Sequence, residues 1–252
     1  MPAPPAAFDG WIGVDSLSAV FLVLTSLLFL AVTVYGIGYV HHEPVPSRRD
    51  PQDGRPANNE PESIFTGSLL LLLATMSLAV VSRHFALQWV AIEATTLASA
   101  PLVYYHRSRR SLEAAWKYVI LCSVGIGLAL LGIFFIRMTV PGGLDVLTVD
   151  ALLRQAGEVN HKWLGTAFLF LLVGYGTKMG LAPLHTWLPD AHSEAPAPIS
   201  ALLSGALLNC AFLGILRVQQ VAAAAGIAAF GGELLIVFGL LSMGLAGVFI
   251  LR

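Results

Sequence analysis

The chain has 252 residues, of which 56% are hydrophobic and 12% charged, and its mean hydropathy is +0.76. Soluble domains are about 45 to 50% apolar and about 25% charged, so this composition excludes a soluble globular protein. Intrinsic disorder requires low hydrophobicity and high net charge, whereas 14 Lys and Arg here nearly balance 15 Asp and Glu. This balance also argues against a nucleic-acid partner and leaves a protein embedded in a lipid bilayer.

Long apolar runs dominate the sequence. A bilayer core about 30 Å thick requires helices of about 20 apolar residues. The runs are rich in Leu, Ala and Val without strict alternation, which is typical of helices and not of barrel strands. We therefore predict an all-α, polytopic transmembrane bundle with about seven spans. A cleaved signal peptide carries positive charge before its apolar run. No Lys or Arg precedes the first run here, so we expect this run to be a permanent span. The runs are 16–40, 64–82, 85–105, 116–138, 163–182, 199–218 and 226–251.

The loops between the runs indicate an orientation. The short loop 106–111 carries Arg107, Arg109 and Arg110, and short basic loops face the cytoplasm under the positive-inside rule. This places the polar, proline-containing loop 41–63 inside and the N-terminus outside. The loop 139–162, which holds Arg154 and Lys162, then lies outside and opposes this assignment.

Glu93 is the first ionisable residue that lies deep in an apolar run. It follows Phe85 by eight residues and precedes Tyr105 by twelve, so at about 1.5 Å per residue it lies near the bilayer midplane. A charge at that depth costs at least about 2.5 kcal/mol and persists where it faces protein or water. A structural carboxylate is one reading, and we favour a proton or ion pathway.

Lys178 is the second deep charge, fifteen residues beyond Trp163. Glycines at 174, 176 and 180 and the proline Pro183 surround it, so we expect a broken helix between Lys178 and Pro183, with Gly176 and Gly180 taking part. Irregular backbone at membrane depth is tolerated where it lines a cavity or is buried in protein. The alternative is a lysine that extends from a helix end to the interface.

Three further residues are candidates for the same pathway. Lys117 follows Glu113 by four residues, so both share one helix face, either as an interfacial ion pair or as pathway residues. His185 is close enough to Lys178 in sequence to serve as a titratable relay. With His192 and two nearby acids it also resembles a metal site, but a simple helix break is favoured, and we expect no metal, cofactor or catalytic site.

One stretch carries a family resemblance. From Gly176 to Leu203 the chain reads GTKMGLAPLHTWLPDAHSEAPAPISALL, which resembles the signature of antiporter-like proton-pumping subunits of respiratory complex I, Mrp-type antiporters and membrane-bound hydrogenases. QWVAIEATTLASAPLV around Glu93 and EAAWKYVILCSVGIGLALLGIFFI from Glu113 agree in order. The stretches EATTLASAPL and LLSGALLNCAFLGILR are most similar to component F of hydrogenase-4 or formate hydrogenlyase complexes.

The resemblance implies roles for named residues. Glu93 corresponds to the family's mid-membrane glutamate, Lys178 to the lysine of its broken helix and Lys117 to a lysine of the next helix. Glu93 and Lys178 would pair in a proton half-channel without a cofactor in this subunit. The implied partners are other membrane subunits and peripheral redox subunits of the Ni-Fe hydrogenase or quinone oxidoreductase type, in the cell membrane.

Some positions and the length depart from the family pattern. Ser123, Ile126 and Ser204 stand where quinone-reductase members have Arg, Asp and His, which favours a hydrogenase-type complex. Family members have two inverted repeats, so within one transmembrane domain, 1–252, we expect a first half-channel repeat at 64–218 and the start of an incomplete second repeat at 226–252.

Three functions stay open. The chain is a proton-translocating subunit of a respiratory-type oxidoreductase, or a membrane subunit of an Mrp-type cation/proton antiporter or proton-coupled bicarbonate uptake system, or a truncated structural subunit that does not pump.

Overall fold

The structure is a computed structural model that describes residues 6–7, 10–42, 59–140 and 147–251. Its fold is all-α, as predicted, with one pair of two-residue antiparallel strands in the described part of the chain. In chain order the elements are β1 (Ala6–Ala7), β2 (Ile12–Gly13), α1 (Ser16–His42), α2 (Glu62–Val81), α3 (Phe85–Val103), α4 (Arg109–Arg137), α5 (Val149–Arg154), η2 (Ala156–Glu158), α6 (His161–Met179), α7 (Leu188–Glu194), α8 (Ala197–Leu202), η3 (Leu203–Leu207), α9 (Leu208–Ala224) and α10 (Ala228–Ile250).

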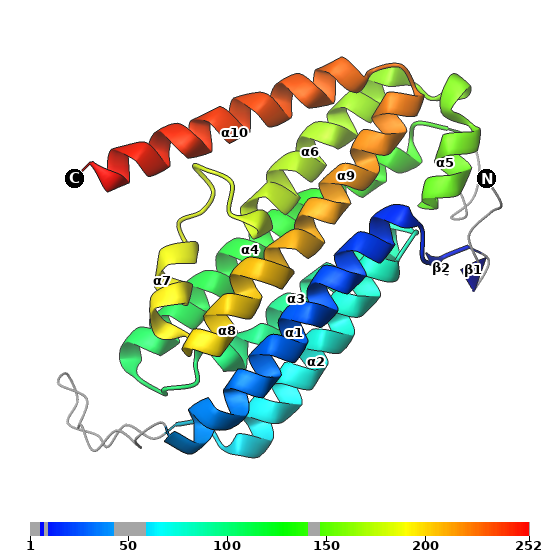
Figure 1. Ribbon diagram of the computed structural model, residues 1–252. Coiled ribbons are helices and arrows are strands. Elements are labelled where there is room, and N and C mark those ends of the chain that lie inside the picture. The colour runs from blue at the N-terminus through cyan, green and yellow to red at the C-terminus, as the bar shows by residue number, and fades with distance from the viewer. Residues whose placement is uncertain (1–5, 8–9, 43–58, 141–146, 252) are drawn as a thin grey trace.

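The helices form a transmembrane bundle (Figure 1). Within the described ranges, six segments are long and apolar enough to cross a membrane: α1, α2, α3, α4, the continuous run from α8 to α9, and α10. The remaining predicted span, 163–182, corresponds to α6, which is outside this set and carries Lys162 and Lys178 near its two ends. It still packs between α4 and α9, so the prediction of about seven spans agrees with the bundle.

Helix α6 approaches α4 closely because small residues face each other. A Cβ added at Gly174 would collide with the backbone of Gly125 and Ala129 on α4, so this position requires glycine. Although Gly174 is one of the glycines around Lys178, it lies inside the continuous helix α6 and serves close packing.

The predicted helix break lies just beyond Lys178. Helix α6 ends at Met179, and Gly180 adopts a left-handed backbone with φ of 79°. Gly180 and Pro183 thus belong to the irregular segment that leads to α7. Gly176 does not, because α6 is continuous through it.

The bundle has two ends that the charges distinguish. The basic end, named for the turn 104–108 and the start of α4, also holds α7 and the start of α8 (Figure 1). There Arg107 donates two 2.7 Å hydrogen bonds to Glu60. The α5 end holds β1, β2 and α5 (Figure 1), and an ion pair of 2.5 Å there joins Arg83 to Asp150.

A second ion pair at the α5 end joins α1 to α9. Arg217, whose side chain is 1% exposed, donates hydrogen bonds to both carboxylate oxygens of Asp15 and one of 2.8 Å to Ser18. Asp15 also accepts a 2.8 Å bond from the Ser18 amide at the start of α1. The sequence alone did not reveal this pair, because its members lie 202 positions apart.

We expect the basic end to face the cytoplasm. In Arg110→Cys, an impermeant thiol reagent should label inverted vesicles and leave intact cells unlabelled. Lys162→Cys, at the exposed start of α6, should give the reverse pattern. The native Cys122 and Cys210 are buried and should contribute little background. Labelling of Arg110→Cys in intact cells would overturn the orientation.

Candidate functional site

Lys178 occupies the centre of the candidate site. Its side chain is fully buried in the last turn of α6. The ammonium Nζ donates a 2.6 Å hydrogen bond to the Tyr118 hydroxyl and a 2.9 Å bond to Thr96 Oγ1. It also lies 4.5 Å from the centroid of the Tyr118 ring, within the range of a cation–π interaction. Neutral groups thus solvate this buried cation.

Glu93 lies close by on α3 but has a different partner. Its Oε1 accepts a 2.6 Å hydrogen bond from Ser123 on α4, and its Oε2 is buried without a partner in the described part of the chain. Because Thr96 follows Glu93 by three residues, both lie on one face of α3. Thr96 binds Lys178, so the structure brings the two predicted charges to neighbouring positions.

No ion pair of 4.0 Å or less joins Glu93 to Lys178 among the described residues. The pairing that the resemblance implied is therefore not the arrangement seen here. Lys178 instead binds Thr96, which lies about one helical turn beyond Glu93 on α3.

A hydrogen-bonded branch extends from Lys178 through Tyr118 to α3. The Tyr118 hydroxyl lies 2.7 Å from Ser99 Oγ, which in turn lies 2.7 Å from the Thr95 carbonyl oxygen. We call Glu93, Thr96, Ser99, Tyr118, Ser123 and Lys178 the Lys178 cluster.

Sequence reasoning missed the hydroxyl-bearing members of this cluster. A signal for two of them was present, since Glu93, Thr96 and Ser99 recur every three residues in an apolar run and so form a polar stripe on one helix face. Tyr118 and Ser123 had no comparable signal, because their role depends on how α4 packs against α3 and α6.

Lys117 and Glu113 lie at the surface of the basic end. Lys117 Nζ is 2.7 Å from Glu113 and 2.9 Å from Asp190 of α7, and the Lys117 side chain is 47% exposed. The three residues line a charged pocket of about 140 Å³. Their spacing on one helix face is confirmed, and a solvated ion pair is what the structure shows.

His185 lies between α6 and α7. It is half-buried, and its Nδ1 has no hydrogen-bond partner in the described ranges. In the described part of the chain, His185 makes no hydrogen bond or ion pair with Lys178. Its predicted role as a relay therefore has no support from a direct contact. Among the described residues no group of three or more His, Cys, Asp or Glu could hold a metal ion.

We expect the surface ion pair to matter little for folding. In Lys117→Met, the midpoint of unfolding by sodium dodecyl sulfate should stay within error of the wild type, because solvent and salt screen exposed pairs. A shift as large as that of a core substitution would show that Lys117 anchors α7.

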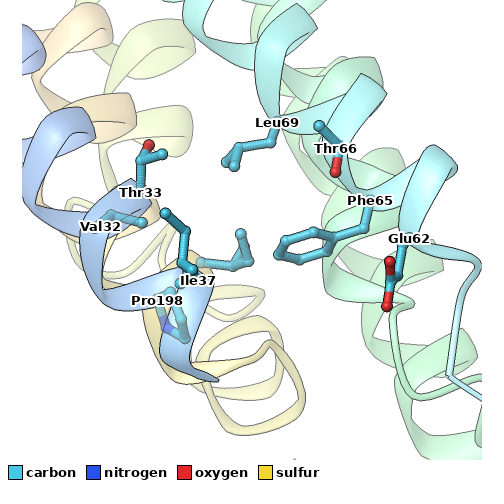
Figure 2. A pocket seen from close by; sticks show the side chains of 10 residues that line it. Val32, Thr33, Ile37, Glu62, Phe65, Thr66, Leu69 and Pro198 are labelled. Carbon is cyan, nitrogen blue, oxygen red and sulfur yellow. The ribbon is translucent and has the colours of Figure 1, made fainter. Parts of the chain in front are cut away.

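A separate apolar cavity of about 270 Å³ lies between α1, α2 and α8. Figure 2 shows Val32 and Ile37 on one side, Phe65 and Leu69 on the other, and Glu62 at its edge. It shares no lining residue with the Lys178 cluster. Its apolar walls offer no chain of hydrogen bonds across the bundle.

The fold and the Lys178 cluster define a multi-pass helical membrane protein with ionisable side chains inside its bundle. Residues 82–252 match the family described as NADH:quinone oxidoreductase/Mrp antiporter, TM. The chain belongs to this family, and the resemblance seen in the sequence is confirmed.

Similar proteins support the assignment. The chain is 39% identical over 244 residues to the hydrogenase-4 component F homolog of Methylacidiphilum infernorum (isolate V4), covering 95% of this chain and 49% of the relative. A chain of respiratory complex I from Thermus thermophilus matches with a TM-score of 0.65 and 26% identity, covering 90% of this chain and 52% of that one.

A chain of the archaeal membrane-bound sulfane sulfur reductase has the same fold, with a TM-score of 0.75 at 18% identity, over 94% of this chain and 45% of that one. The chain thus spans about half the length of these relatives.

Proposed function

We propose that the chain is a proton-translocating membrane subunit of a respiratory-type oxidoreductase complex in the cell membrane, of the hydrogenase-4 or NADH-quinone oxidoreductase kind. The observation that carries this proposal is Lys178, a lysine buried completely at membrane depth and held by hydroxyl groups. Ionisable groups in such positions are costly and mark proton or ion pathways.

The chemistry proposed for the site is proton exchange. A lysine can lose its proton when its surroundings change, and the Glu93 carboxylate, one helical turn from Thr96, is the acid nearest in the stripe on α3. Proton movement between Glu93 and Lys178 would pass the Thr96 hydroxyl, which accepts from the ammonium at 2.9 Å and has its own proton to donate.

Electron transfer is assigned to partner subunits. The relatives named hydrogenase-4 component F homolog and respiratory complex I support peripheral subunits of the Ni-Fe hydrogenase or quinone oxidoreductase type. Residues 64–218 would form the first half-channel repeat and 226–252 the start of the second. Helix α10, whose most apolar 18-residue stretch has no buried residue, fits a place outside the first repeat.

A second candidate is a membrane subunit of an Mrp-type cation/proton antiporter, because the family description names both classes. The same Lys178 cluster would then couple proton flow to cation exchange.

The polypeptides that purify with the tagged chain from mild detergent distinguish the candidates. We expect Ni-Fe hydrogenase or quinone oxidoreductase and iron–sulfur subunits. Cation-antiporter subunits would support the second candidate, and a zinc-containing partner a bicarbonate uptake system. Recovery of the chain alone would contradict both complexes and leave a structural role.

A further inference from the structure

The direction of the hydrogen bonds around Tyr118 follows from the chemistry of lysine. An ammonium group has three donors and no acceptor, so the Tyr118 hydroxyl must accept from Lys178 at 2.6 Å. The Tyr118 proton is then free to point at Ser99 Oγ at 2.7 Å, and the Ser99 proton points at the Thr95 carbonyl oxygen. The branch therefore ends on the backbone of α3 and holds the hydroxyl of Tyr118 in an orientation suited to a charged lysine.

The same hydroxyl is suited to the neutral lysine. An amine accepts a hydrogen bond, so the Tyr118 O–H can turn from Ser99 to donate to Nζ. Tyr118 thus has a hydrogen-bonded arrangement for each protonation state of Lys178.

The two charges of the cluster would attract each other strongly in a medium of low dielectric constant. Glu93 Oε2 is buried without a partner in the described part of the chain, and an ammonium could satisfy it. Of the two hydroxyls that bind Lys178, Thr96 lies on the Glu93 face of α3, whereas Tyr118 lies on α4. Tyr118, at 2.6 Å, is the shorter of the two hydroxyl contacts that hold the ammonium where it makes no ion pair with Glu93 in the described part of the chain.

We propose that Tyr118 is a positioning residue, which holds the Lys178 ammonium apart from Glu93 and so keeps the two groups from locking into a permanent ion pair. This inference rests on the proposed function in one respect, since the separation matters for transport if protons move between the two groups. The position of the ammonium itself is a structural matter that is tested independently.

The substitution Tyr118→Phe removes the hydroxyl and keeps the ring. The ring packs 4.9 Å from Trp187, measured between centroids, and lies under the ammonium, so the packing and the cation–π contact are retained. Tyr175→Phe is a matched control. Tyr175 is also fully buried, one helical turn before Lys178 on α6, and its hydroxyl has no hydrogen-bond partner among the described residues.

The first readout is the contact between Lys178 Nζ and the Glu93 carboxyl carbon. The full chain, labelled with 15N-lysine and 13C-glutamate and reconstituted in liposomes, is measured by solid-state NMR dipolar recoupling. A Glu113→Gln background removes the lysine–glutamate pair at the surface, and Lys178→Met identifies the Lys178 signal. We expect an ion-pair contact, within about 4 Å, in Tyr118→Phe and in neither the parent chain nor Tyr175→Phe.

The second readout is proton translocation by the assembled complex. We expect Tyr118→Phe to lower its rate roughly tenfold, since a hydrogen bond to a charged group is lost, and Tyr175→Phe to leave it unchanged. Ser99→Ala, which removes the acceptor that orients Tyr118, should act in the same direction with a smaller loss and stands in if Tyr118→Phe does not assemble.

The two readouts separate the inference from the proposed function. Absence of the Lys178–Glu93 contact in folded Tyr118→Phe overturns the positioning role, whatever the transport rate. If the contact appears and the wild-type complex translocates no protons, the positioning role stands and the proposed function fails. Equal losses in Tyr118→Phe and Tyr175→Phe would show a general packing effect and overturn the link to transport.

Discussion

Replacing Asp15 with alanine is expected to lower the free energy of unfolding by about 3 to 5 kcal/mol. The substitution leaves the Arg217 guanidinium, 1% exposed, without its carboxylate partner, and Arg217 Nε is already buried without a hydrogen bond in the described structure. It also removes the side-chain oxygen that accepts from the Ser18 amide at the start of α1, and loss of such a cap costs about 1 kcal/mol.

The opposite substitution should be milder. Arg217→Met leaves the Asp15 side chain 21% exposed, so water can solvate the carboxylate that remains. Unfolding by sodium dodecyl sulfate, followed by circular dichroism, gives the three values needed: Asp15→Ala, Arg217→Met and the double variant. The double variant should be more stable than Asp15→Ala alone, because no unpaired buried charge remains. An equal cost for both single variants would contradict the asymmetry, and the exposed Lys117→Met serves as the control.

The same pair makes stability depend on pH. Burial alone would raise the pKa of Asp15, but hydrogen bonds from Arg217 and Ser18 and the Arg217 charge lower it well below its ordinary value of 3.8. Since the folded pKa is below the unfolded one, the contribution is complete above about pH 4 to 5 and is lost as the pH falls through the folded value. In Arg217→Met, stability should decline less steeply below pH 4.

The parts of the fold that follow from composition and periodicity could be predicted. The spans are indicated by the length of their apolar runs, and the basic loop by its clustered arginines. The break after Lys178 is indicated by glycine and proline close together. Residue 174 shows the limit of that reasoning. From the sequence alone, a glycine in a helix suggests a position that destabilises the helix. In the structure, Gly174 is the position where the backbone of α4 approaches α6.

The partners of the buried charges could not be predicted in the same way. Glu93 and Lys178 are visible as charges in apolar runs, but the groups that bind them lie on other helices: Ser123 is 30 positions from Glu93, and Tyr118 is 60 from Lys178. The family resemblance implied that Glu93 and Lys178 pair with each other. In the structure each group has hydroxyl partners instead.

The largest functional effect is expected from Lys178. In the assembled complex, Lys178→Met should abolish or strongly reduce proton translocation, while electron transfer by the partner subunits continues at least in part. Methionine keeps much of the volume of the fully buried side chain and removes the charge, so the packing of α6 should survive. Lys178→Arg is the matched variant, because arginine keeps the charge and does not release its proton.

Both variants should therefore fail to translocate protons. Failure of the arginine variant would show that a positive charge at position 178 is not sufficient and that the residue must also release its proton. A structural subunit would be insensitive to either change. The presence of the variant subunit in the purified complex, shown by immunoblot, is a condition for interpreting each result.

The most direct measurement is the formation of a pH gradient alongside electron transfer in inverted membrane vesicles that contain the wild-type, Lys178→Met or Lys178→Arg complex. We predict a gradient in the wild type and little or none in either variant, with electron transfer retained. A normal gradient in Lys178→Met vesicles, with the variant subunit present, would contradict the assignment of Lys178 to the proton pathway.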